Sequence, residues 1–448
     1  MWRALPAVLL LVGCATAVDL PEIDPSAGIP PVWSESFEAP GESITSLAGL
    51  SGDPRLRQLV RAALEGNPDI ARTALRLRES GALLAVSQGR RLPGVELDAG
   101  QRQDRSAEQA SSTSTTTVGL TLDWEIDVWG RLADQVREAE RRHSALAADQ
   151  RAARSSLAAR TLQAALEQIL RSRRLEIETR RAASLEQTLE IIRERYRLGL
   201  GSVTDWDAAQ SELARSRAQG REDAEAVARS RRRLGLLLGD LAAAPPALPN
   251  SLPTVWRPLV PMPGETLAQR PDVAASLDRL AAAGLAEEVA RKALLPGFRL
   301  TGSLTAEGTS LDSLLEDDPA WTLLANLAAP LINRKALLAE HEAAQYRRAQ
   351  AAYSHRIVLL DAVLEIENGL GTERSLLEQL PALELSQHHA ELSLTSFEGQ
   401  YTRGLADILD LLAAQRAAFD SQLRLIEART ALLQNRIDLG LALGLEAI

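Results

Sequence analysis

Histidine and cysteine are the residues of this chain best suited to metal binding or acid–base chemistry, and their spacing argues against both. The five histidines are His143, His341, His355, His388 and His389. None has a second histidine four residues away, and adjacent His388 and His389 project to different faces of a helix. The sequence also has no Gly-x-Ser-x-Gly elbow and no phosphate loop. We therefore expect no enzymatic activity, no metal site and no cofactor.

The single cysteine, Cys14, follows a short apolar segment that is preceded by the positive charge of Arg3. This segment is too short to cross a bilayer and has the form of a signal peptide over residues 1–13. Leu11-Val12-Gly13-Cys14 resembles the lipobox of bacterial lipoproteins, which implies cleavage before Cys14 and acylation of its thiol. Ala15, not aspartate, comes next, as in lipoproteins sent to the outer membrane. An ordinary signal peptide with an incidental cysteine is the alternative.

The composition predicts long helices and an acidic surface. Aromatic residues make up 3% of the 448 residues, and the formal net charge is −10. Few aromatics with abundant Ala, Leu, Arg and Glu are typical of long helices. Nucleic-acid binding would need a basic face, so the charge argues against it. No segment after the signal peptide has about 18 uninterrupted apolar residues, so we expect no transmembrane helix.

The chain carries an internal duplication. Leu92-Pro93-Gly94 recurs as Leu295-Pro296-Gly297 after a shift of 203 residues, and Ala208-Ala209-Gln210 recurs as Ala413-Ala414-Gln415 after a shift of 205. A period this long is the size of a domain and exceeds the roughly 20–50 residues of solenoid repeats. We therefore divide the chain into a lipidated N-terminal tether (14–50), a first repeat (51–242), a proline-rich linker (243–265) and a second repeat (266–448).

The first repeat is expected to contain helices, two β-strands and a pair of long helices. Asp53-Pro54 and Asn67-Pro68 have the form of helix starts, because proline is favoured at the first helical position. Alternation of apolar and polar residues predicts strands near 95–100 and 118–126, with an exposed Ser/Thr-rich loop at 106–117 between them. Residues 131–197 contain no proline or glycine and predict a helix of roughly 100 Å. A return helix is expected over 204–238.

The second repeat has the same order of elements. A helix is expected from Arg270-Pro271 to about Leu294, and strands are expected to begin at Phe298 and Trp321. A long helix over 334–401 and a last helix over 406–443 follow. Gly369, Gly371 and Pro381 mark places where the long helix could bend.

The four strands are about 9–11 residues long, the length that crosses a bilayer as a tilted β-strand. Four strands cannot close on themselves, and an open edge in lipid leaves backbone groups unpaired at several kcal/mol each. If they enter a membrane, two chains must share a barrel of 8 strands, or three chains one of 12. Glu96, Asp98, Asp123 and Glu125 on the polar face favour a water-filled lumen over the alternative, a small soluble sheet.

At this point the chain resembles the outer membrane efflux protein family, the TolC-like channels, and within it the lipoprotein branch of the OprM/NodT type. The resemblance covers nearly the whole chain. It is carried by Cys14, by Arg270-Pro271-Asp272-Val273, by the paired Leu-Pro-Gly turns, and by the related turns Tyr196–Leu200 and Tyr401–Leu405. It implies a mainly α fold with a small β part. Three chains form an α-barrel of long antiparallel helices that continues into a shared 12-stranded membrane β-barrel, with four strands per chain.

The resemblance implies a periplasmic gate at the two helix-to-helix turns, where rings of aspartate line the constriction. Asp410 falls on the principal ring position, whereas the next aligned position is Ala413. Asp407 lies one turn before Asp410 on a similar helix face. Threefold symmetry would bring like charges together around one axis, at a cost in repulsion that a closed state must offset. Capping of the following helix is the alternative role for Asp407.

Hydrogen bonds and salt bridges between neighbouring helices hold this gate shut in the family. Tyr401 matches the family's latch tyrosine, and Asp205, after Thr204, matches its acceptor. The position of the latch arginine is occupied by Ala406, and Arg403 is nearby but displaced. Helix capping is again the alternative role for Asp205.

The resemblance implies the outer-membrane channel of a tripartite export system. Such a channel is lipid-anchored in the outer membrane, extends into the periplasm, and conducts substrate passively from an inner-membrane pump through a periplasmic adaptor protein. The expected partners are therefore two further copies of the chain, the adaptor, the pump and outer-membrane lipids, without nucleic acid. The alternative is a non-conducting structural coiled-coil lipoprotein of the periplasm. The sequence does not specify the substrate.

Overall fold

A computed structural model describes residues 24, 28–35, 41–105, 112–242, 247–309 and 318–448. The lipidation prediction at Cys14 lies outside these residues. The chain forms two compact units, each built from both halves of the sequence. We call the first the sheet unit; it contains Leu75–Ala148 and Ala274–Val358. We call the second the tip unit; it contains Gly28–Ala74, Asp149–Val273 and Leu359–Ile448.

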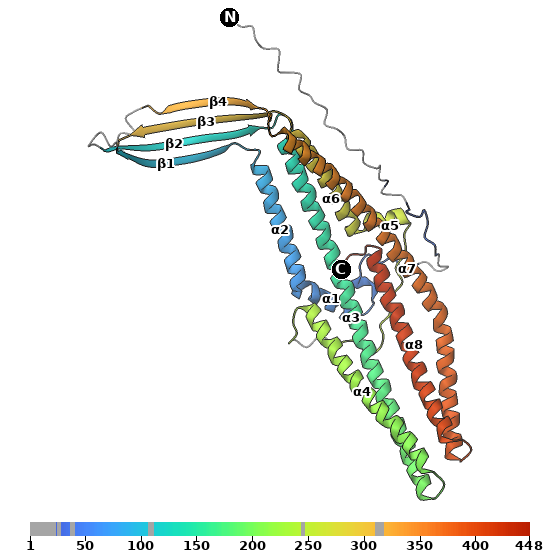
Figure 1. The fold of residues 1–448 in the computed structure, drawn as a ribbon. Helices are drawn as coiled ribbons and strands as arrows, with labels where there is room; N and C mark the ends of the chain where they lie inside the picture. Colours follow the sequence, from blue (N-terminus) through green and yellow to red (C-terminus); the bar gives the residue numbers. More distant parts are fainter. Residues whose placement is uncertain (1–23, 25–27, 36–40, 106–111, 243–246, 310–317) are drawn as a thin grey trace. The chain divides into compact units, whose positions relative to one another are not determined.

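The sheet unit contains one antiparallel sheet of four strands in the order β1-β2-β3-β4 (Figure 1). The strands are β1 (Gly94–Arg105), β2 (Ser112–Ile126), β3 (Gly297–Gly308) and β4 (Ala320–Ala328). The two central strands come from different halves of the chain, so the sheet joins the halves. The outer strands β1 and β4 each have one neighbour.

The register places apolar side chains in rows across one face of the sheet. Leu97 pairs with Leu120, Leu120 with Leu304, and Leu304 with Trp321. None of the described residues covers this face, since Leu97 is 72% exposed and Trp321 is 74% exposed. A continuous apolar surface of this kind marks contact with a membrane or a partner.

The opposite face of the sheet is polar and forms cross-strand contacts. The Thr121 hydroxyl donates to Asp98 at 3.1 Å, and Arg299 lies 3.3 Å from Asp123. The strands at both repeats were predicted, but the loop expected at 106–117 was placed wrongly, because β2 already begins at Ser112. Threonine is β-branched, so the Ser/Thr-rich sequence suits a strand with a polar face as well as a loop.

A short helix packs on a long helix in each half of the sheet unit. The pairs are α2 (Pro68–Gly89) with α3 (Arg131–Arg197), and α6 (Pro271–Lys292) with α7 (Arg334–Thr402). In the first pair the Ser80 hydroxyl lies 2.7 Å from Nδ1 of His143, and in the second the Ser276 hydroxyl lies 2.7 Å from Nδ1 of His355. Burial lowers the pKa of His355, so it packs as a neutral ring. His143 and His355 are thus used in helix packing.

The tip unit adds η1 (Ala48–Leu50), α1 (Pro54–Gly66), α4 (Val203–Leu238), α5 (Pro263–Gln269) and α8 (Ile408–Ala442). Asp53 caps α1 by accepting the Arg55 N–H at 2.9 Å, as its position before proline predicts. Leu47 and Leu50 are fully buried in the main core, so the end of the predicted tether is a packed strap.

The long helix α7 remains one helix through Pro381. None of the helices described has the length and apolar run needed to span a membrane.

Arg270 is a buried clamp at the start of α6. Its guanidinium donates to the Ala442 carbonyl at 2.7 Å, to Asp272 at 2.7 Å and to Glu365 at 2.8 Å. It thereby satisfies a carbonyl at the end of α8 and fixes α7 beside it. Burial acts to lower the pKa of Arg270, but the two carboxylates outweigh burial and raise it. Arg270 therefore stays charged, and the Arg-Pro-Asp motif has a structural role.

We expect Arg270→Ala to destabilise the protein by roughly 2 kcal/mol, chiefly because it leaves the buried Ala442 carbonyl without its donor, whereas Asp272 and Glu365 are half-exposed and regain water. Arg291→Ala is the matched control, since Arg291 forms a half-exposed pair with Glu288 on the same helix and should cost under about 1 kcal/mol. Urea unfolding followed by circular dichroism measures both. Equal losses in the two variants would contradict the clamp.

Candidate functional site

Two related turns end the helical hairpins of the tip unit, one between α3 and α4 and one between α7 and α8 (Figure 1). Gly199 and Gly404 have φ of 72° and 77°, a left-handed conformation that favours glycine. The Leu200 N–H bonds to the Arg195 carbonyl at 2.8 Å, and the Leu405 N–H bonds to the Gln400 carbonyl at 2.9 Å. Both helices therefore end with the same glycine-dependent cap.

The two hairpins share one apolar cluster just above these turns. It contains buried residues from all four helices: Leu185, Ile192, Ala209, Leu213, Tyr401, Ile408, Leu411 and Leu412. A polar layer follows, in which the Gln415 amide donates to Thr188 at 2.8 Å and to Ser184 at 3.1 Å. The pairing of α3 with α8 therefore continues along the hairpins away from the turns.

Tyr401 is buried in this cluster and contacts Arg195, a residue that the sequence did not indicate. The Arg195 guanidinium carbon lies 5.0 Å from the centre of the Tyr401 ring, and its NH1 donates to the Tyr401 carbonyl at 3.0 Å. The net effect of the surroundings is to raise the pKa of the Tyr401 phenol, chiefly through burial. The charge of Arg195 acts to lower this pKa, whereas the charges of Asp205 and Asp407 act to raise it. Both predicted aspartates thus act on the Tyr401 phenol electrostatically, and Arg195 is the cation in contact with its ring.

The aspartates at the turns have capping contacts. Asp205 belongs to a capping box: its N–H bonds to the Ser202 hydroxyl at 3.1 Å, and its carboxylate accepts the Ser202 N–H at 3.1 Å. Thr204 lies 2.6 Å from the same hydroxyl. Asp407 is the N-cap of α8 and accepts the Ile408 N–H at 2.6 Å. These contacts fit the capping role considered for both aspartates.

Arg403 and Asp410 lie apart from these capping contacts. The Nε of Arg403 donates to the Gly399 carbonyl at 2.9 Å, so this side chain folds back on its own helix. Asp410 is exposed in the first turn of α8. This position leaves the Asp410 carboxylate available to face a threefold axis. Its role in a ring of aspartates around that axis stays a prediction.

Glu212 is the charged centre that links the two hairpins. It is 5% exposed and lies 3.0 Å from Arg181 of α3, 2.6 Å from Arg215 of α4, and 3.2 Å from Arg416 of α8. Arg181 also lies 3.3 Å from Asp420 of α8. Burial acts to raise the pKa of Glu212, but the arginines outweigh burial and lower it, so Glu212 is ionised. Sequence periodicity alone could not show that these charges converge.

An uncovered apolar sheet face and two long helical hairpins with matching turns define the class of outer-membrane efflux channels. The family model described as outer membrane efflux protein matches residues 59–240 and 262–445, so the chain belongs to that family. It is the outer-membrane channel component of an efflux system.

The chain is also similar to individual members. It is 28% identical to outer membrane protein OprJ of Pseudomonas aeruginosa, over 98% of this chain and 95% of OprJ. It is 24% identical to the probable outer membrane lipoprotein SilC of Salmonella typhimurium, over 98% of this chain and 97% of SilC. The CmeC outer membrane channel of Campylobacter jejuni has the same fold, with a TM-score of 0.86 at 21% identity over 96% of this chain and 95% of CmeC.

We expect Glu212→Gln to weaken the junction between the hairpins by roughly 3 kcal/mol, because it leaves three arginines sharing a neutral amide. Glu186→Gln is the matched control, since Glu186 forms an exposed pair with Arg217 inside one hairpin and should cost under about 1 kcal/mol. Limited proteolysis at the tip and urea unfolding report the difference. Two variants of equal stability would show that the link is unimportant.

We expect Arg195→Met to destabilise the tip by roughly 2 kcal/mol, through loss of the cation–π contact and the hydrogen bond to Tyr401. Arg193→Met serves as the control, because Arg193 lies two residues before Arg195 and forms only an exposed pair with Glu190. Amide hydrogen exchange of the segment around Tyr401 measures local opening. Unchanged protection there would rule out a latch role for Arg195.

Proposed function

We propose that three copies of this chain assemble into a passive conduit across the outer membrane. The sheet supports this proposal, because within the described part of the chain its apolar face is uncovered and strands β1 and β4 each have a free edge. Four strands from each chain close a barrel of 12, which removes every edge from the lipid. The polar face then lines a water-filled lumen. A periplasmic coiled coil without a pore gives no reason for such a sheet.

The turns of the tip unit form the gate of this conduit. Threefold symmetry places three copies of Asp410 around the axis, where they raise the local cation concentration and repel one another. Tyr401, Thr204, Asp205 and Asp407 stabilise the turns beside the ring, and Arg195 and Glu212 bind the hairpins together. Arg403 lies at the same end, where it caps its own helix. Opening of the gate requires that contacts between neighbouring hairpins change.

The tip also supplies a docking surface for a periplasmic adaptor protein. Leu198, Leu200, Leu405 and Leu409 are exposed at the two turns, with Leu200 and Leu405 at matching positions, and exposed leucines grouped in this way favour contact with a partner. An inner-membrane pump loads substrate through the adaptor, and Cys14, once acylated, anchors the channel to outer-membrane lipids. Conduction of this kind needs no catalytic residue and no cofactor.

Purified protein is expected to conduct ions in planar lipid bilayers, and Asp410→Ala is expected to raise the conductance several-fold by removing the charged ring. Asp207→Ala is the control, because Asp207 is an exposed aspartate at the start of α4. Chemical cross-linking in mild detergent reports the number of chains. A monomer without conductance, in both the wild type and the Asp410 variant, would overturn the channel proposal.

A further inference from the structure

One end of the sheet contains all four junctions between strands and helices. β1 begins at Gly94 and β3 at Gly297, whereas β2 ends at Ile126 and β4 at Ala328, and the antiparallel register brings these four ends together. Figure 1 shows the helices leaving the sheet at this end. The strands cross the outer membrane in the proposed conduit, so this end lies at the periplasmic surface of the membrane, where lipid headgroups begin.

The duplication gives this end two equivalent seams. The inner seam joins β2 to β3 within one copy. The outer seam joins β4 of one copy to β1 of the next in the closed barrel, so this inference rests on the channel proposal. Gly94 pairs with Asp123 and Gly297 pairs with Ala328, so β2 and β4 are related by the same shift of 205 residues as the Ala-Ala-Gln motifs. Residues beside the inner seam therefore have counterparts beside the outer one.

At the inner seam, carboxylates within the chain neutralise the cations. Lys292 pairs with the buried Asp134, and Arg131 lies 2.6 Å from Glu125. A third carboxylate, Asp127, caps the start of α3 by accepting two backbone N–H groups. The inner seam thus needs no ion from outside the chain.

The outer seam lacks these carboxylates. A shift of 205 residues places Pro330, Ile332 and Ala339 at the positions of the three acids. The two segments that meet at the outer seam, 86–95 and 326–337, contain no aspartate or glutamate. They contain four cationic residues: Arg90, Arg91, Arg334 and Lys335.

Three of these four cations are unpaired. Arg334 has a partner within the chain. The exposed side chains of Arg90, Arg91 and Lys335 form no ion pair with the described residues. Lys335 also lies in the first turn of α7, where the helix dipole disfavours a cation. The nearest carboxylate of β1, Glu96, belongs to the polar face, because it alternates with the apolar row. The outer seam therefore has a positive charge that no described residue beside it neutralises.

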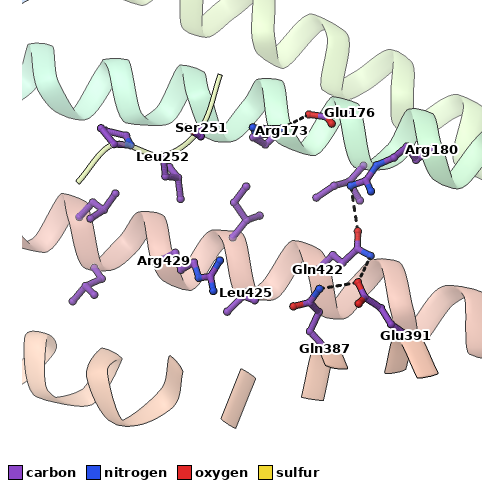
Figure 2. Close-up of a pocket in the computed structure, with 15 residues that line it drawn as sticks. Arg173, Glu176, Arg180, Ser251, Leu252, Gln387, Glu391, Gln422, Leu425 and Arg429 are labelled. Atoms are coloured by element: carbon purple, nitrogen blue, oxygen red, sulfur yellow. Dashed lines mark hydrogen bonds and ion pairs between the residues drawn. The ribbon is translucent and has the colours of Figure 1, made fainter. Parts of the chain in front are cut away.

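The arginines of the tip unit do not show such a surplus. Figure 2 shows a pocket of about 620 Å³ between α3, α7 and α8 that is also lined by arginines. Each has a matching acid: Arg173 with Glu176, Arg429 with Glu384, and Arg180 with Glu391 through Gln422. That pocket is balanced in charge, whereas the outer seam of the sheet is not.

The surroundings of the unpaired cations are those of a membrane surface. Trp124 pairs with Leu300 on the apolar face of the sheet, and its indole donates to the Arg91 carbonyl at 3.1 Å. This contact holds the backbone of Arg91 toward the face that meets lipid. Leu92 and Leu331 are exposed beside the cations. Tryptophan is enriched at the level of lipid headgroups, with basic residues beside it.

We propose that each outer seam binds the headgroup phosphate of an anionic phospholipid, through Arg90 and Arg91 of one copy and Lys335 of the next. Guanidinium and ammonium groups both donate to phosphate oxygens, and the charges strengthen these hydrogen bonds. A zwitterionic lipid brings its own cation to the seam, so an anionic headgroup is favoured. The exposed leucines contact the acyl chains of the same lipid. Each site is complete only after two copies have assembled.

Quenching of tryptophan fluorescence by brominated lipids tests the proposal on the full-length protein in vesicles, because Trp124 lies beside the site. A Trp321→Phe background removes the exposed tryptophan at the other end of the apolar face. The vesicles contain equal amounts of phosphatidylglycerol and phosphatidylcholine, with bromine on one or the other. We expect phosphatidylglycerol to bind at least about fivefold more tightly, the factor that one cation near an anionic surface contributes. Salt should reduce this preference.

The triple variant Arg90→Gln, Arg91→Gln, Lys335→Gln should lose the preference for phosphatidylglycerol. The matched control is the triple variant Arg193→Gln, Arg217→Gln, Arg232→Gln, which removes three exposed, paired arginines of the tip unit. This control should keep the preference of the wild type, because its arginines lie far along the helices from the strands.

Chemical cross-linking of the same samples counts the chains and separates this inference from the channel proposal. Cross-linked trimers without a lipid preference, or an equal preference in the seam variant and the wild type, would overturn this inference alone. Equal loss in the control variant would do the same. Inorganic phosphate that abolishes the preference at matched ionic strength would reveal a site for free phosphate in place of lipid. A monomer would overturn both proposals, because a monomer has no outer seam.

Discussion

Every β-strand needs a hydrogen-bonded neighbour on each side if it is to lie in lipid, and one copy of this chain provides that only for β2 and β3. Other molecules must therefore supply neighbours for the outer strands β1 and β4 and a contacting surface for the uncovered row from Leu97 to Trp321. This constraint explains why a protein with a helical majority and an acidic surface must assemble at a membrane.

The helical part depends on buried charges with several partners. Arg270 joins the start of α6 to the end of α8 and the middle of α7, and Glu212 joins α3, α4 and α8 through three arginines. Buried ion pairs add little net stability compared with apolar packing, but they strongly disfavour alternative registers. In helices as long and as uniform as α3 and α7, where Ala and Leu recur throughout, such fixed points define which turns lie side by side.

Much of the fold could be predicted from local sequence, because its signals are local. The stretch without proline or glycine at 131–197 predicted α3, and alternation at 118–126 predicted the centre of β2. The start of β2 at Ser112 was missed, since polar β-branched residues suit both loops and lumen-facing strands. The roles of Arg195 and Glu212 were missed for another reason. Apart from Arg215, their partners lie on other helices, 31 to 206 residues away in the sequence, and a single sequence contains no signal for such pairs.

The pairing of β2 with β3 has a consequence for how the protein folds. Leu120 on β2 pairs with Leu304 on β3, so the sheet cannot form until the second half of the chain has been made. Until β3 is available, the hairpin of β1 and β2 exposes an apolar face and an unpaired edge. Contacts this far apart in sequence form slowly, and exposed edges promote aggregation in the interval. The order of synthesis thus gives the first hairpin the longest unprotected lifetime of any element in the sheet.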